Sequence, residues 1–199
     1  MKDLLQEKWQ AGINYEAYRT MIDELLVENK TTGTNHSEAM IHYTKLNVQR
    51  MKRLDKTVQL EEALKAAIAA IDQPMRWLVL TEAWCGDAAQ NIPVLAHIAV
   101  ASKYIDLKFI LRDEHPDCMD QFLTNGGRSI PKLICLNEEG TVIGTWGPRP
   151  EPAQKMTMDY KANPIVDYQE FVVEVQKWYA KDRTKTVQQE FINLLEQWK

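Results

Sequence analysis

A short apolar segment that runs straight into a cysteine turn constrains the fold of this chain more than any other feature. Residues 76–81 are too few for a helix and are typical of a buried strand, and Trp84, Cys85 and Gly86 end that pattern before helical spacing restarts at Ala88. The first backbone N–H groups of a helix lack partners, and the positive end of the helix dipole lies there. Both favour a thiolate, so the pattern predicts a nucleophilic cysteine at a helix start.

Four landmarks, in order along the chain, resemble the thioredoxin superfamily. They are a cysteine after a buried strand, a proline eight residues later in the following helix, a second strand followed by Asp-x-x-Pro, and a proline that opens a further strand. The residues that carry them are Cys85, Pro93, residues 107–111 with Asp113 and Pro116, and Ile130 with Pro131. The resemblance covers roughly residues 58–147 and implies a thioredoxin-like α/β fold.

The pattern along the chain predicts a mixed four-stranded sheet flanked by helices. Expected strands lie at 76–82, 106–112, 131–137 and 141–146, and expected helices at 14–30, 37–54, 58–71, 88–102 and 116–124, with Ser37 as an N-cap. The first two strands, joined by a helix, favour a parallel right-handed unit, and the turn at 138–140 favours a final hairpin.

Two further helices are expected at the C-terminal end. Asp167 is placed as the cap of a helix that would match the one closing a thioredoxin core, and a second apolar stripe lies beyond it. The first stripe is Tyr168, Phe171, Val172, Val175, Trp178 and Tyr179, and the second is Val187, Phe191, Leu194, Leu195 and Trp198. We therefore expect a helical N-terminal extension over 1–57, a thioredoxin-like domain over 58–182 and a C-terminal helix over 183–199.

The resemblance also implies roles for residues around the cysteine. Ile130-Pro131 would be a cis bond that turns the Ile130 backbone toward Cys85, ready to pair with an extended substrate. Trp84 would offer a flat apolar surface to a partner, and Asp113 would accept a hydrogen bond from the Trp84 indole. Trp84 could equally be only a half-buried aromatic, and Asp113 could equally be a helix cap.

The predicted site has Cys85 as its catalytic residue. The residues expected at the substrate are Trp84, Gly86, Asp87, Ile130 and Pro131, and those expected to support them are Ala88, Pro93 and Asp113. The helix start favours the Cys85 thiolate by about 0.3–1 kcal/mol, while a solvated Asp87 would oppose it by about 1 kcal/mol. These effects nearly cancel, so we expect a thiol pKa only modestly below its ordinary value.

Two positions depart from the family pattern. Thioredoxins carry a second cysteine three positions after the first, where this chain has Ala88, so Cys85 cannot close the usual intramolecular disulfide. The family also tends to bury an acid six residues before the cysteine, where this chain has Val79. No Gly-Gly-Asp follows Pro131, so the motif that helps glutaredoxins hold glutathione is missing.

Composition excludes several classes of function. The net charge is −4 and no Lys/Arg stripe is present, which gives no reason to expect nucleic acid. The four histidines, His36, His42, His97 and His115, show no metal-ligand spacing, and no phosphate-binding glycine loop is present, so neither a metal nor a cofactor is expected. No signal-peptide pattern or membrane-spanning run is seen, so we expect a cytoplasmic protein without a disulfide framework.

Three functions are compatible with these residues. The first is a monothiol oxidoreductase, in which Cys85 forms mixed disulfides that an external thiol resolves, with a protein disulfide or a small thiol as partner. The second is a redox-inactive binding module on the same surface. A peroxide-reducing cysteine is a third, although no activating Thr, Ser or Arg is evident near it. Cys118 is conceivable as a distant resolving cysteine, whereas Cys135 fits a small buried residue within a strand.

Overall fold

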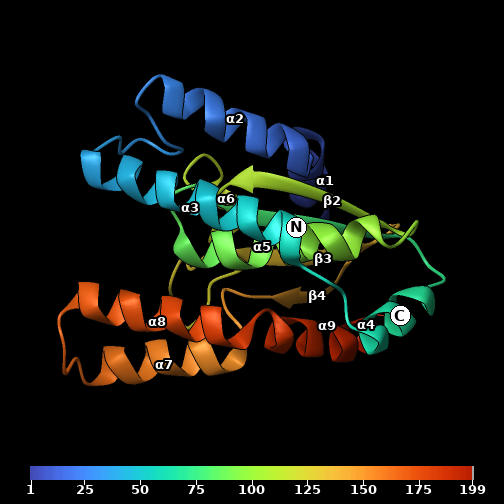
Figure 1. Cartoon of the computed structure of the whole chain (residues 1–199). Helices are drawn as coiled ribbons and strands as arrows, with labels where there is room; N and C mark the ends of the chain where they lie inside the picture. Colours follow the sequence, from blue (N-terminus) through green and yellow to red (C-terminus); the bar gives the residue numbers. More distant parts are fainter. Residues whose placement is uncertain (199) are drawn as a thin grey trace.

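A mixed four-stranded sheet in the order β2-β1-β3-β4 forms the centre of the fold (Figure 1). The computed structural model describes residues 1–198. The strands are β1 (Met75–Thr81), β2 (Ile105–Leu111), β3 (Lys132–Asn137) and β4 (Val142–Trp146). β1 is parallel to β2 and antiparallel to β3, which pairs antiparallel with β4. The sheet predicted from the sequence is therefore confirmed.

The central strand β1 leads directly to the cysteine turn. Every residue of β1 except Arg76 is buried, as expected for an interior strand covered on both faces. Helix α5 (Gly86–Val100) follows and returns the chain to the start of β2, which makes the parallel connection that the sequence predicts. Pro93 lies inside α5, and Cys85 is its N-cap residue. The cysteine thus stands where the innermost strand ends and a helix begins.

The other helices agree with the sequence pattern in most places. They are α1 (Lys2–Ala11), α2 (Tyr15–Val27), α3 (Glu38–Thr57), α4 (Glu62–Ala69), α6 (Pro116–Met119), α7 (Glu151–Ala162), α8 (Tyr168–Asp182) and α9 (Lys185–Gln197). Ser37 is the N-cap residue of α3, but its side chain makes no capping hydrogen bond. Asp167 caps α8 as predicted, by accepting from two backbone N–H groups.

The main differences from the predicted helices are two boundaries and two additional helices. The expected helix 58–71 starts only at Glu62, and the expected helix 116–124 ends at Met119 because the chain turns into a bridge between Thr124 and Gly127. α1 and α7 were not predicted. The start of α7 lies among prolines that suggest a loop, although proline is well tolerated in the first turn of a helix.

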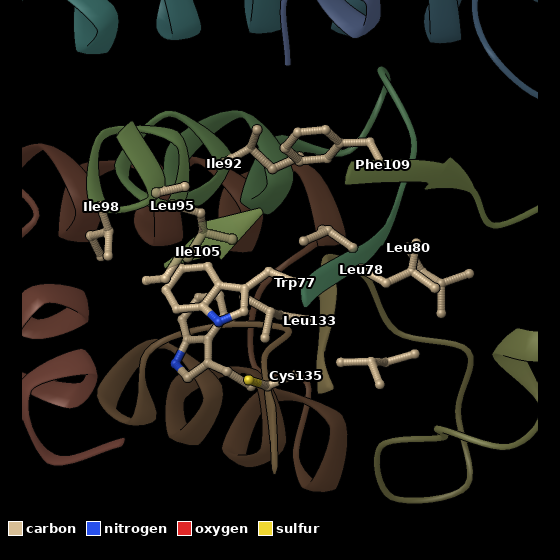
Figure 2. Packing of buried hydrophobic residues seen from close by; sticks show 14 of the residues in the cluster. Trp77, Leu78, Leu80, Ile92, Leu95, Ile98, Ile105, Phe109, Leu133 and Cys135 are labelled. Carbon is tan, nitrogen blue, oxygen red and sulfur yellow. The ribbon is translucent and has the colours of Figure 1, made fainter. Parts of the chain in front are cut away.

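Trp77 lies at the centre of the main hydrophobic core. Its side chain is fully buried, and Figure 2 shows it with Ile105 of β2 and with Leu133 and Cys135 of β3 around it. The core therefore depends on one large aromatic side chain on the innermost strand.

Helix α9 packs against this aromatic centre. The ring centroid of Phe191 lies 5.2 Å from that of Trp77 and 5.4 Å from that of Trp146, and Trp198 meets Trp77 edge-on at 6.1 Å. Gly144 of β4 makes this possible, because a Cβ there would collide with the Trp198 indole. The C-terminal stripe is therefore part of the main core.

Helix α8, which we expected to close the core, has another role. Its buried residues Val175 and Tyr179 form a small second cluster with Ala153 of α7. The expectation was wrong because an apolar stripe on a helix fits another helix as well as a sheet. α7 and α8 pair with each other, and Figure 1 shows them as two adjacent orange and red helices.

The N-terminal helices lie beside β2 at the edge of the sheet (Figure 1). Ile13, between α1 and α2, pairs with Phe109 through two backbone hydrogen bonds of 3.0 and 2.7 Å, and so covers part of that edge. No helix within residues 1–198 has the length and apolar character to cross a membrane.

Candidate functional site

Cys85 contacts the segment that contains the predicted cis proline. The Ile130–Pro131 bond is cis, as predicted, and the Cys85 thiol donates a hydrogen bond to the Ile130 carbonyl at 3.3 Å. Gly147 backs this segment, since a Cβ at that position would collide with the Pro131 carbonyl. The backbone N–H of Ala88 points at the Cys85 sulfur from 3.5 Å, as expected for the first turn of a helix.

The Cys85 thiol is less acidic than the sequence suggests. Only 7% of the residue is exposed. Burial raises its pKa to about 12, the nearby Asp87 carboxylate adds to the rise, and the helix N–H groups and Arg149 oppose it. The prediction of a modestly lowered pKa was therefore wrong, because it treated both Cys85 and Asp87 as solvated.

Asp87 is held in a largely buried polar network. One carboxylate oxygen pairs with Arg149 at 2.7 Å, and the other accepts a hydrogen bond from the Tyr179 hydroxyl at 3.0 Å. The Asn91 amide donates to the same hydroxyl at 3.0 Å and to the Asp87 backbone carbonyl at 2.8 Å. Burial raises the pKa of Asp87, and Arg149 and Tyr179 hold it down. The network fixes the start of α5 to α8 and to the loop before α7.

Trp84 has a different neighbour from the one that the resemblance implied. The guanidinium of Arg112 lies over its ring, 4.8 Å from the centroid, and pairs with Asp113 at 2.8 Å. Within the described part of the chain, Asp113 accepts from Arg112 and receives no hydrogen bond from the Trp84 indole. Trp84 therefore presents a ring backed by a cation beside the cysteine.

A buried acid is present near the turn, although the position where thioredoxins tend to bury an acid is Val79 in this chain. Glu82, one position beyond β1, is fully buried and accepts from the backbone N–H of Asp113 at 2.9 Å. Its backbone carbonyl accepts from the Cys85 N–H at 3.1 Å, and burial raises the pKa of its carboxyl. Glu82 is thus a structural support of the turn that the sequence reading missed.

Cys118 and Cys135 do not belong to the site. Both are fully buried, Cys118 in α6 and Cys135 in β3, and burial raises the pKa of their thiols to about 11 and about 12. Ala88, at the position of the family's second cysteine, is also buried. Cys85 is therefore the one cysteine of the described chain that lines an open hollow.

The hollow beside Cys85 is a groove of about 390 Å³. It lies between α3, the turn at 84–87, the segment 128–130 and helices α7 and α8. Four of the five residues expected at a substrate, Trp84, Gly86, Asp87 and Ile130, line it with Cys85, whereas the fifth, Pro131, is buried and is not part of this lining. Its other walls are formed by residues of α3 and α8, and no sequence motif predicted that these helices would line the site. A volume of this size is typical of sites for small ligands, about 300–1,000 Å³.

The reactivity of Cys85 is expected to follow its high pKa. Alkylation should accelerate about tenfold per pH unit from about pH 7 to about pH 11 without a plateau, because the thiolate fraction grows throughout that range. Iodoacetamide labelling, resolved by peptide mass spectrometry to separate Cys118 and Cys135, measures this. A rate that levels off near about pH 8 would mean an activated thiol and contradict the buried environment.

Comparisons with known proteins agree on the fold. A family model described as thioredoxin matches residues 33–161, more than half of the chain. Among solved structures, a protein of unknown function from Pseudomonas aeruginosa has a TM-score of 0.65 and 19% identity over 96% of each chain. An HIV epitope scaffold also has a TM-score of 0.65, with 17% identity over 96% of each chain. At such identities these two structures show the fold alone. The comparison with curated proteins gave no match.

Proposed function

The chain belongs to the thioredoxin family, and we propose that it carries out thiol–disulfide exchange with Cys85 as its single reacting sulfur. The observation that carries the proposal is the 3.3 Å contact of the Cys85 sulfur with the Ile130 carbonyl, beside cis Pro131 and at the wall of the groove. A disulfide in the groove would meet the sulfur on one side and the Ile130 backbone on the other.

The exchange has two steps. The Cys85 thiol loses its proton to solvent, and the thiolate attacks one sulfur of the substrate; a Cys85–sulfur bond forms, the substrate disulfide breaks, and the leaving thiolate takes up a proton. Because Ala88 offers no second sulfur, an external thiol must attack the mixed disulfide. The external thiolate, which has lost its proton to solvent, bonds to the sulfur of the substrate fragment, the Cys85–sulfur bond breaks, and the released Cys85 thiolate takes up a proton.

A thiol with a high pKa can still serve this reaction. Little thiolate is present near neutral pH, but the thiolate that forms is more nucleophilic than that of an acidic thiol. Holding the disulfide against the sulfur raises its effective concentration further. The substrate is accordingly a small disulfide, or an exposed protein disulfide that reaches into the groove. A small external thiol as reductant fits a reducing compartment such as the cytoplasm.

A binding protein without redox activity is the second candidate. The observation that favours it is the 7% exposure of Cys85 together with a pKa raised by burial to about 12. Trp84 and Ile130 would then frame a binding groove with Pro131 buried behind them, and Cys85 would only fill space at the groove wall.

A mixed disulfide on the native protein separates the two candidates. After incubation with neutral hydroxyethyl disulfide, intact-protein mass spectrometry is expected to find one adduct, mapped to Cys85, that a monothiol removes. Cys85→Ser should abolish the adduct, whereas Cys118→Ser and Cys135→Ser should retain it, since both thiols are fully buried. An adduct that forms only in denaturant would favour the binding protein.

A further inference from the structure

The groove beside Cys85 is basic, although the chain as a whole has a net charge of −4. Its charged lining consists of four arginines and one aspartate, namely Arg50, Arg112, Arg128, Arg149 and Asp87. The arginines come from separate segments of the chain, and the fold gathers them around one hollow. A concave surface of one sign concentrates ligands of the opposite sign.

Three of these arginines already have a carboxylate partner. The pairs are Arg112 with Asp113 at 2.8 Å, Arg128 with Asp120 at 2.6 Å and Arg149 with Asp87 at 2.7 Å. Their charges are largely balanced within the protein. The remaining positive charge of the groove therefore belongs to Arg50.

Arg50 is half-buried and forms no ion pair within residues 1–198. Its Nη1 donates to the Asn47 side-chain oxygen at 2.8 Å, and the Asn47 amide donates to the Ala83 carbonyl at 2.8 Å, just before the cysteine turn. A Cβ built on Gly86 would lie 3.5 Å from the same Nη1. Arg50 is thus fixed beside the residue that follows Cys85. Burial and the charge of Arg53 lower the pKa of Arg50, and the Asp87 carboxylate, which pairs with Arg149, opposes that shift.

We propose that Arg50 binds a carboxylate of the ligand, so that the groove selects small thiol or disulfide compounds that carry an acidic group. A guanidinium fits a carboxylate through two parallel hydrogen bonds, which gives orientation as well as attraction. Anchored there, the compound would place its sulfur toward Cys85. The sulfur chemistry of the ligand rests on the proposed function, whereas the carboxylate site does not depend on it.

Binding to a chain that cannot react tests the site alone. In Cys85→Ser, isothermal titration at low salt should detect dithiodipropionate, an acidic disulfide, and not cystamine, a basic disulfide of the same length. Arg50→Gln in the same background is expected to weaken binding about tenfold to a hundredfold, the range for a hydrogen bond to a charged group. Arg50→Lys should lose less, because it keeps the charge.

Arg53→Gln is the matched control. Arg53 lies one turn further along α3, is exposed and does not line this groove. Its replacement should change the affinity much less than Arg50→Gln does, because it removes a nearby charge but no direct contact. Thermal unfolding of each variant shows whether the helix is intact. Equal binding of the acidic and basic disulfides, no binding of either, or equal losses in Arg50→Gln and Arg53→Gln would each overturn the carboxylate site.

The outcomes also separate this inference from the proposed function. Exchange of Cys85 with neutral hydroxyethyl disulfide, combined with no preference for dithiodipropionate, would leave thiol exchange standing and remove the carboxylate site. Binding of dithiodipropionate through Arg50, combined with no adduct on Cys85, would support the carboxylate site and contradict thiol exchange.

Discussion

Asp87→Asn is expected to make Cys85 react about tenfold faster or more near about pH 8, because removal of a like charge lowers the pKa of the thiol by about one unit or more. Asp87 is the second cause of the raised pKa, after burial, and its loss also frees Arg149 to stabilise the thiolate. Alkylation of Cys85, followed by peptide mass spectrometry, measures the change.

The same substitution should reduce stability. Asp87 and Arg149 form a largely buried ion pair, with 12% and 19% of their side chains exposed, and breaking a buried pair costs about 3–5 kcal/mol when one partner is removed. Asparagine retains an oxygen that accepts from Tyr179, so we expect the loss of stability to be near the lower end of that range. Asp113→Asn is the control: it removes a charge that pairs with Arg112 at the other side of the groove and should leave the Cys85 rate unchanged. A rate that is unchanged or slower in Asp87→Asn would contradict this description of the site.

Trp77→Ala is expected to lower the free energy of unfolding by about 3–5 kcal/mol, the range for deleting a buried aromatic side chain. Trp77 is fully buried on the innermost strand, and its ring contacts those of Phe191 in α9 and Trp198, the C-cap residue of that helix. Domains are stable by only about 5–15 kcal/mol, so this variant would be near the limit of folding.

Chemical denaturation followed by circular dichroism measures that loss. Trp178→Ala is the comparison, since Trp178 is half-buried and packs with Tyr179 in the small cluster of α7 and α8. Its replacement should cost less than half as much. If Trp77→Ala cost less than about 1 kcal/mol, α9 would not be the helix that completes the main core.

The sequence predicted the position of the cysteine turn in the fold because the signals there are local. A strand, a cysteine turn and a helix follow one another without interruption, and their order alone places Cys85 at the helix start. The proximity of Ile130 to Cys85 was predicted from the resemblance to thioredoxins, whose landmarks this chain repeats in order.

The walls of the groove could not be predicted in the same way. Arg50, which lines the groove, and Tyr179, which donates to Asp87 behind it, lie on helices whose polar and apolar faces fit many partners. Only the packed structure places them beside the turn. The error in the Cys85 pKa has this origin, because burial by distant segments is the main cause of the shift. The closing role was assigned to α8 rather than to α9 for a related reason: the two apolar stripes look alike in sequence, and the aromatic contacts of Phe191 decide between them.

The central claim is that Cys85 alone carries out exchange, and thiol-dependent turnover tests it most directly. With hydroxyethyl disulfide and an excess of a monothiol, the rate above the uncatalysed reaction should scale with protein concentration and vanish in Cys85→Ser. It should also rise with pH, as the high pKa of the thiol requires. A rate above background that survives in Cys85→Ser, or a wild-type rate equal to background, would contradict the account.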